Sequence, residues 1–271
     1  MKQLTDPIIR QIAGAPGLLI CLDYDGTLTP IVKNPAKGVL SASGRNLLRA
    51  LKKLQGVRIA LISGRSLKSL KKMVRVPGMI YAGNHGFELE GFGMKRVHPA
   101  ALATRSVMRR IVGKLKTDCR LIPGLLIENK TYSLSVHYRR LPAKEIPAAK
   151  SLLLKSIGPF LKSSQVILTD GKKVWEIRPA AEWNKGTTLV WLFARVFSEG
   201  PGHIHPLYIG DDLTDEDAFK ALKNRGTVIK VTGKQKEHSH AVYRLRSPRE
   251  VLEFLKKIII YRQKRNWRHE N

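Results

Sequence analysis

Short apolar runs alternate with longer amphipathic segments in the first part of the chain. Three runs of strand length, at residues 17–22, 57–62 and 79–82, each end at an aspartate, a serine or a glycine. Between them, apolar residues recur every three or four positions, which predicts helices over about 43–55 and 67–74. Alternating strands and helices predict a parallel sheet that is covered by helices on its faces.

A different pattern follows residue 86. Two helices, each followed by a pair of strands, are predicted over residues 99–116, 125–128, 132–138, 146–160, 166–169 and 174–178, with the last pair turning at Asp170 and Gly171. The strand at 132–138 alternates between apolar and polar residues, so one face of this sheet should be covered and the other open. This part of the chain therefore predicts an inserted α+β domain.

Alternation of strands and helices resumes at residue 184. The predicted elements are a helix to about residue 196, a strand at 206–209, a helix capped by Thr214, a strand at 227–231 and a final helix over about 248–261 that frays into a basic tail. The chain is thus expected to be an α/β protein with a Rossmann-like parallel-sheet core. This core comprises residues 1–98 and 179–271, and the α+β domain that interrupts it comprises residues 99–178.

The composition is that of a globular protein with a substantial core. The 271 residues are 43% hydrophobic, and they suffice for one large or two small domains. Cys21 and Cys119 are too few for a disulfide framework, and no apolar run approaches the roughly 18 residues of a membrane span. We therefore expect a soluble cytoplasmic protein. The sequence does not predict the oligomeric state, although a monomer is favoured.

The charge is unusual, because 49 Lys and Arg residues against 21 Asp and Glu residues give a net charge of +28. Such a surface attracts anions of every kind and would bind nucleic acid weakly without any specific site. The sequence contains no helix-turn-helix signature, zinc-finger spacing or aromatic RNA-binding motif. The charge therefore indicates a solvated basic surface suited to an anionic substrate, and we expect no specific nucleic-acid partner.

Two aspartates, Asp23 and Asp25, directly follow the first apolar run. They should lie at the carboxyl end of a buried strand, where open α/β sheets place their ligands. Two carboxylates this close raise the pKa of one of them or recruit a cation. The alternative is an Asp-Gly turn with two solvated carboxylates.

Further polar groups follow other predicted strands. Ser63 and the backbone N–H groups after it could bind phosphate oxygens, and Lys185 at the start of a helix could supply a fixed positive charge. Asp211, Asp212 and Asp215 together are unfavourable at one strand end unless a cation offsets them, and oxygen ligands of this kind favour Mg²⁺. Taken singly, these residues are also consistent with a turn, a surface lysine and a helix cap.

These four stretches, Asp-x-Asp-Gly-Thr-Leu, Ser, Lys and Gly-Asp-Asp, resemble in kind and order the motifs of haloacid-dehalogenase-type phosphatases. The resemblance implies that Asp23 is the nucleophile that attacks phosphorus and that Asp25 is the general acid/base. It implies that Ser63 and Lys185 hold the phosphoryl oxygens. The Mg²⁺ ligands that it implies are Asp23, the backbone of Asp25, and Asp211, with Asp212 and Asp215 close by.

A narrower resemblance covers about residues 18–255. Gly83-Asn84-His85-Gly86-Phe87-Glu88, Glu128-Asn129-Lys130 and Glu176-Ile177-Arg178-Pro179 resemble motifs of the trehalose-6-phosphate phosphatase family. In that family the inserted domain contributes a Glu, a Lys and a second Glu to the sugar hydroxyls, and an arginine lies near the phosphate end. The substrate-binding residues thereby implied are Arg65, Asn84, His85, Glu128, Lys130, Arg139 and Glu176.

The function expected from this resemblance is Mg²⁺-dependent hydrolysis of trehalose 6-phosphate to trehalose and phosphate through an aspartyl-phosphate, in trehalose biosynthesis. One alternative is a phosphatase of another sugar phosphate, against which the Glu128 and Glu176 motifs argue. The other is a protein that binds polyanions or nucleic acid and has a vestigial phosphatase fold, as the net charge of +28 suggests. The complete set of motifs argues against that alternative.

Overall fold

The computed structural model describes residues 1–32, 34–120, 122–196, 204–234 and 237–270. The chain divides into two compact units. Unit 1 comprises Met1–Lys95 and Trp183–Asn271, and unit 2 comprises Arg96–Glu182. The predicted insertion at residues 99–178 falls within unit 2.

Unit 1 is built on a mixed sheet. The strands lie in the order β1 (Lys2–Gln3), β13 (Tyr243–Leu245), β12 (Thr227–Val231), β11 (Ile204–Gly210), β2 (Gly17–Leu22), β3 (Val57–Ile62), β4 (Ile80–Gly83), β5 (Glu88–Gly91) and β6 (Met94–Val97). Neighbouring strands from β1 to β4 are parallel, whereas β5 runs antiparallel to β4. The prediction of an α/β fold with a parallel sheet is confirmed.

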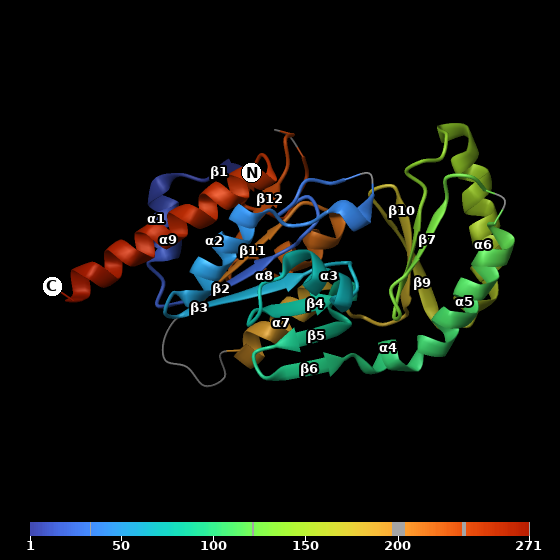
Figure 1. Ribbon diagram of the computed structural model, residues 1–271, viewed down its shortest axis with the longest axis horizontal. Helices are drawn as coiled ribbons and strands as arrows, with labels where there is room; N and C mark the ends of the chain where they lie inside the picture. The colour runs from blue at the N-terminus through green and yellow to red at the C-terminus, as the bar shows by residue number, and fades with distance from the viewer. Residues whose placement is uncertain (33, 121, 197–203, 235–236, 271) are drawn as a thin grey trace. The chain divides into compact units, whose positions relative to one another are not determined.

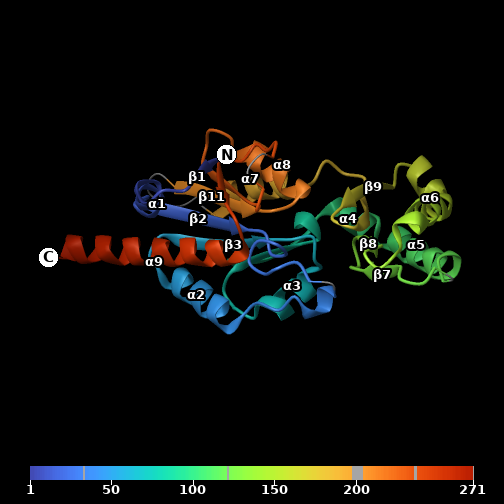
Figure 2. The ribbon, with the colours of Figure 1, turned by 90° about the horizontal axis from the view of Figure 1, so that it is seen from above.

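Helices cover both faces of this sheet (Figure 2). One face packs against α1 (Asp6–Ala13), α2 (Ala42–Lys53), α3 (Leu67–Val74) and α9 (Pro248–Glu270), and the other against α7 (Lys185–Val196) and α8 (Glu216–Leu222). The alternate residues of β2 face the two cores: Leu18, Ile20 and Leu22 one, Leu19 and Cys21 the other. Burial on both faces explains why this strand is an uninterrupted apolar run.

The strand order brings the predicted site residues to one edge. Strand β2 pairs with β3 on one side and with β11 on the other, so the chain order reverses at β2. The backbone N–H of Asp23 donates to the carbonyl oxygen of Ile209 over 2.9 Å, which ties the ends of β2 and β11 together. Open α/β sheets bind ligands at such a reversal, beyond the carboxyl ends of the strands.

Unit 2 contains an antiparallel sheet in the order β7 (Leu126–Asn129), β8 (Leu134–His137), β10 (Val174–Pro179) and β9 (Val166–Gly171). Helices α5 (Arg105–Asp118) and α6 (Ile146–Lys162) cover one face of it (Figure 1). Leu134, Val136, Trp175 and Ile177 point into that shared core, and the opposite face carries the polar residues of the same strands.

Several predicted boundaries were wrong. The hairpin of β5 and β6 was not predicted, because strands of four residues with few apolar positions give a weak periodic signal. The helix predicted over 99–116 is two helices, α4 (Pro99–Ala103) and α5, which meet at Thr104, whose hydroxyl donates to the Ala100 carbonyl over 2.8 Å. Short elements near the ends of the chain, α1, β1 and β13, were also not predicted.

The residues predicted to turn the hairpin and to cap a helix also have other positions in the structure. Asp170 and Gly171 belong to β9, and the hairpin turns at Lys172 and Lys173, where Lys173 has a φ of 65°. Thr214 does not cap α8. Instead, Asp212 and Asp215 form a capping box at the start of the preceding 3₁₀ turn, Leu213–Asp215. In it, the Asp215 carboxylate accepts from the backbone N–H of Asp212.

Helix α9 continues to Glu270 instead of fraying near residue 261. Its buried stripe contains Val251, Phe254, Leu255, Ile258 and Ile259, and the next position of that stripe is Arg262. Arg262 is 8% exposed, and its guanidinium donates to four carbonyl oxygens, those of Ala13, Ala15, Pro16 and Gln55, over 2.7–3.2 Å. A cation in the apolar stripe therefore ties the end of α1 and the turn before β3 to α9. None of the helices in the described part of the chain is both long and apolar enough to span a bilayer.

Arg262→Ala should lower the free energy of unfolding by about 2–3 kcal/mol, because hydrogen bonds to a charged donor are lost and buried carbonyl groups lose their partner. Denaturant unfolding measures this change. Arg249→Ala is the control, because that side chain is 88% exposed and its loss should change the free energy of unfolding by no more than about 0.5 kcal/mol. Equal effects of the two substitutions would contradict this account of Arg262.

Candidate active site

Lys185 joins two carboxylates at the edge of the sheet in unit 1. Asn184 caps α7 by accepting from the backbone N–H of Thr187 over 2.9 Å, which places Lys185 in the first turn of the helix. The Lys185 Nζ lies 2.9 Å from Asp23 Oδ1 and 2.7 Å from Asp215 Oδ1. All three charged side chains are buried, so these ion pairs are largely shielded from solvent.

Asp211 completes a group of three buried carboxylates with Asp23 and Asp215, whose nearest oxygens all lie within 4.8 Å of one another. The Thr27 hydroxyl donates to Asp211 Oδ1 over 3.2 Å. Gly26, with a φ of 86°, passes so close that a Cβ atom there would lie 2.2 Å from Asp211 Oδ2. Only glycine therefore fits the turn that brings the loop after β2 against Asp211.

The pKa of the Asp23 carboxyl is raised well above its usual value. Burial is the main cause, and the neighbouring charges of Asp215 and Asp211 add to it, whereas Lys185 opposes it. Burial lowers the pKa of Lys185, but Asp215 and Asp23 outweigh that effect, so the net shift is upward and Lys185 stays charged. A second cation next to Asp23 and Asp211 would favour their ionised forms, and carboxylate oxygens are the ligands that Mg²⁺ prefers.

Asp215 has a different environment from the other two carboxylates. Its Oδ1 accepts from Lys185 and, over 2.8 Å, from the Tyr208 hydroxyl, and its Oδ2 accepts from the backbone N–H groups of Asp211 and Asp212 over 2.9 and 2.8 Å. Although burial raises its pKa, Lys185 and these donors bring the pKa of Asp215 below its usual value. Each oxygen already accepts two hydrogen bonds, so Asp215 is better placed to orient Lys185 and the Asp211 loop than to hold a metal ion.

Asp25 does not join this group through its side chain. Its carboxylate forms a bidentate ion pair with Arg65, whose Nε and Nη2 donate to Asp25 Oδ2 and Oδ1 over 2.6 Å each. Arg65 Nη2 also donates to the Pro35 carbonyl, and the guanidinium lies 5.4 Å from the centroid of the Tyr24 ring. The structure thus places Arg65, expected among the substrate-binding residues, on the carboxylate expected to transfer protons.

Ser63 is buried at the end of β3, and its hydroxyl accepts from the backbone N–H of Arg65 over 3.2 Å. The turn Asn84–Gly86 lies against this loop. The backbone N–H groups of Asn84 and His85 donate to the carbonyls of Arg65 and Ser63 over 2.7 and 2.9 Å, respectively. Asn84 and His85 therefore line up beside Ser63 through backbone contacts, and Thr188 on α7 donates to the His85 carbonyl over 3.2 Å.

In unit 2, the predicted residues Glu128 and Glu176 lie on one face of the sheet, and the predicted Lys130 contacts Glu176. Glu128 and Glu176 both pair in register with Ser135 of the central strand β8, so the three side chains form a row across the sheet. Glu176 Oε1 accepts from Lys130 Nζ and Ser135 Oγ, each over 3.2 Å, and Glu128 Oε2 lies 2.8 Å from His137 Nε2. The row offers charged donors and acceptors side by side, as a polyhydroxylated ligand requires.

Arg139 is not part of this contact network. It lies just beyond β8 and its Nη2 donates to the carbonyl oxygen of Lys172 in the neighbouring hairpin turn, over 2.8 Å.

Four residues with a clear place in these networks were missed by sequence reasoning. Tyr208 lies within an apolar run that predicts a buried strand. The pattern therefore indicates a core residue and gives no sign that its hydroxyl donates a hydrogen bond in the site. Thr27 follows the aspartates but carries no charge that would single it out. Ser135 and His137 lie on the polar face that the alternation of the 132–138 strand predicts, but polar residues on an open face gave no reason to single them out.

Comparison with known proteins shows the fold first. The structure has the fold of a haloacid dehalogenase-like hydrolase from Bacteroides thetaiotaomicron, with a TM-score of 0.61 at 17% identity over 89% of this chain and 99% of that one. The C-terminal domain of C. albicans trehalose-6-phosphate phosphatase matches with a TM-score of 0.79 at 27% identity, over 95% of this chain and 97% of that one.

Sequence comparison then shows the family. The trehalose-phosphatase family model matches residues 21–249. Trehalose-phosphate phosphatase B of Arabidopsis thaliana is 33% identical over 269 residues, which cover 96% of this chain and 70% of that protein. Trehalose-phosphate phosphatase of Mycobacterium avium (strain 104) is 34% identical over 272 residues, 95% of this chain and 67% of that protein. The chain belongs to the trehalose-phosphatase family.

Proposed function

We propose that this protein removes the phosphate group from trehalose 6-phosphate, as a phosphoric monoester hydrolase of trehalose biosynthesis. The observation that carries the proposal is the buried Asp23 carboxylate, held by Lys185 and next to Asp211 at the carboxyl end of β2. A carboxylate nucleophile, a fixed cation and a candidate metal ligand are the groups that phosphoryl transfer through an aspartyl-phosphate requires. Membership of the trehalose-phosphatase family supports the substrate.

The reaction would take two steps. In the first, an oxygen of Asp23 bonds to phosphorus, the bond from phosphorus to the sugar oxygen breaks, and Asp25 gives a proton to that oxygen. In the second, Asp25 takes a proton from water, which attacks the phosphorus and releases phosphate and the Asp23 carboxylate. Ser63 and Lys185 hold the phosphoryl oxygens in both steps, and Lys185 already lies 2.9 Å from Asp23.

The acidic group fits Mg²⁺. Asp23 and Asp211 are the carboxylates best placed to hold it, because the oxygens of Asp215 already accept four hydrogen bonds from protein groups. Asp25 would contribute its backbone carbonyl, since its carboxylate is paired with Arg65, and Asp212 would lie nearby. When bound, Mg²⁺ supplies positive charge that offsets the charge of the transferring phosphoryl group.

Unit 1 would thus be the phosphatase domain and unit 2 the domain that selects the sugar. The row of Glu128, Ser135 and Glu176, with Lys130 beside it, would bind trehalose hydroxyls, and Arg139 is the arginine that the family resemblance assigns to the phosphate end. The high positive charge favours an anionic small molecule as the partner, and we expect no specific nucleic-acid partner. The two cysteines are both free and buried, which is consistent with a cytoplasmic protein.

Purified protein should release phosphate from trehalose 6-phosphate in a Mg²⁺-dependent manner, and faster than from sucrose 6-phosphate or glucose 6-phosphate. Asp23→Asn should reduce kcat by more than about a hundredfold, because an amide cannot attack phosphorus and the loss exceeds that of one proton-transfer group. Colorimetric phosphate release with and without EDTA measures both effects. Activity that survives EDTA would contradict the metal assignment, and a preference for another sugar phosphate would contradict the substrate.

Glu176→Ala should lower kcat/KM for trehalose 6-phosphate by about ten- to a hundredfold, because hydrogen bonds to a charged group are lost. The same variant should hydrolyse p-nitrophenyl phosphate at nearly the wild-type rate, because that substrate has no sugar. Asp170→Ala is the matched control: it removes a carboxylate from the neighbouring strand β9, where Asp170 pairs with Lys150, and should change neither rate. If Glu176→Ala slows both substrates equally, Glu176 supports the fold and does not select the sugar.

A further inference from the structure

Strand β5 carries two glutamates that face α3. Glu88 pairs in register with Gly83 and Glu90 with Tyr81, so both side chains lie on the face of the sheet where α3 packs. Two residues along a strand span about 7 Å, close to the roughly 6 Å spanned by four residues of a helix. Glu88 accordingly meets Leu67, the first residue of α3, and Glu90 meets Lys71 one turn later.

Glu88 joins two backbone segments through one oxygen. Its Oε2 accepts from the backbone N–H of Leu67 over 3.2 Å and from the side-chain amide of Asn84. The carboxylate lies at the N-terminus of α3, where the unsatisfied N–H groups favour negative charge. Burial raises the pKa of Glu88, and the bonds from Leu67 and Asn84 oppose that shift.

The two segments that Glu88 joins follow the carboxyl ends of β3 and β4, and β3 pairs with β2, the strand that ends before Asp23. Leu67 directly follows the loop that contains Ser63 and Arg65, and Asn84 begins the turn that donates backbone hydrogen bonds to that loop. Contact between them is close, because a Cβ atom on Gly83 would lie 2.3 Å from the Leu67 nitrogen. Asn84 and His85 have φ values of 50° and 57°, a region that non-glycine residues rarely occupy, so the turn needs support from its surroundings.

We propose that Glu88 is a positioning residue for phosphoryl transfer: by holding Leu67 and Asn84 together, it fixes the loop that presents Ser63 and Arg65. The inference rests on the proposed function, in which Ser63 holds a phosphoryl oxygen and Arg65 holds the carboxylate of Asp25. Misplacing such groups by about 1 Å can reduce a rate by about a hundredfold. Because these groups act on the phosphate, the effect should not depend on the sugar.

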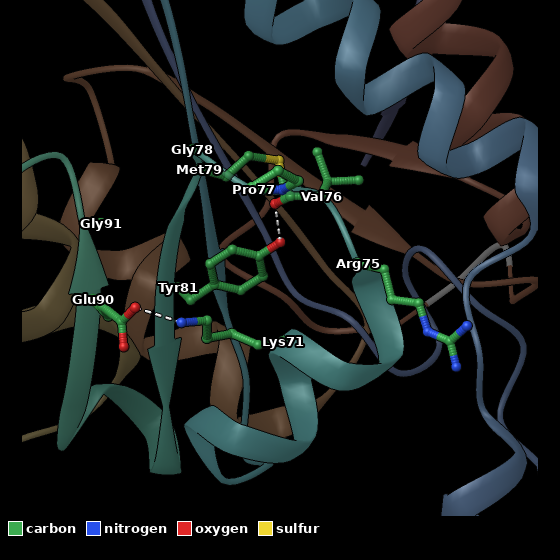
Figure 3. A pocket seen from close by; sticks show the side chains of 9 residues that line it. All are labelled: Lys71, Arg75, Val76, Pro77, Gly78, Met79, Tyr81, Glu90 and Gly91. Atoms are coloured by element: carbon green, nitrogen blue, oxygen red, sulfur yellow. Dashed lines mark hydrogen bonds and ion pairs between the residues drawn. The ribbon is translucent and has the colours of Figure 1, made fainter.

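Glu90 provides the contrasting case on the same strand. It forms an ion pair with Lys71 at the rim of a cavity of about 420 Å³, lined by Lys71, Arg75, Val76, Pro77, Gly78, Met79, Tyr81, Glu90 and Gly91 (Figure 3). Both side chains of the pair are substantially exposed, at 42% and 37%. None of the predicted site residues lines that cavity. Removal of Glu90 therefore removes a contact between β5 and α3 but no contact to the Ser63 loop.

The test compares Glu88→Ala, Glu88→Gln and Glu90→Ala on trehalose 6-phosphate and on p-nitrophenyl phosphate. Glu88→Ala should lower kcat on both substrates by about ten- to a hundredfold, with a smaller change in KM. Glu88→Gln keeps an oxygen that can accept both hydrogen bonds, so kcat should return to within about threefold of the wild type. Glu90→Ala should stay within about twofold on both substrates. Where Glu88→Ala does not fold, Glu88→Asp replaces it, because the shorter side chain withdraws the carboxylate from Leu67.

Thermal unfolding of the same variants separates positioning from a purely structural role. A kcat for Glu88→Ala within about twofold of the wild type would overturn the inference, and so would equal losses for Glu88→Ala and Glu90→Ala, or a Glu88→Gln variant as slow as Glu88→Ala at equal melting temperature. Failure of the proposed function has a different signature in the wild type itself, which would then release no phosphate from trehalose 6-phosphate or would prefer another sugar phosphate.

Discussion

The arrangement of this site depends on the ion pairs that the buried ammonium group of Lys185 forms. Three carboxylates, Asp23, Asp211 and Asp215, lie within 4.8 Å of one another, and one lysine contacts two of them. Without that cation the ionised forms would be strongly disfavoured at a buried position. One lysine still leaves two negative charges uncompensated when all three carboxylates ionise, which is the charge of one divalent cation. A divalent cation beside Asp23 and Asp211 is the counter-charge that we propose for this site.

The same contacts also hold the fold together. Lys185 begins α7, Asp23 ends β2, and Asp215 precedes α8, so residues far apart in sequence meet at one point beyond the sheet. Asp215 uses both oxygens to bind Lys185, Tyr208 and the backbone of the Asp211 loop. Substitutions at this point should therefore affect stability as well as chemistry. Conservative changes, such as amide for carboxylate, are more informative there than truncation to alanine.

The sequence predicts a structural element well when the pattern that specifies it lies within that element. The runs at 17–22 and 57–62 match β2 and β3, because a strand buried on both faces is apolar without interruption. The edge hairpin of β5 and β6 was missed because its strands bury few side chains. Helix α9 was ended too early because Arg262, which occupies a buried position, looks like the start of a basic tail. Hydrogen-bond partners on different elements, such as Tyr208 and Asp215 or Arg65 and Asp25, produce no periodic pattern in the sequence. Their contacts therefore could not be predicted from it.

We propose that Asp23 becomes covalently phosphorylated during turnover. Wild-type protein that is mixed with trehalose 6-phosphate and Mg²⁺, quenched in acid within milliseconds and digested can be searched by mass spectrometry for a phosphorylated peptide. Borohydride reduction of the acyl phosphate then converts the modified aspartate to homoserine and identifies its position. The account predicts modification at Asp23 that is absent without substrate. Modification at another carboxylate, such as Asp25 or Asp211, would contradict it.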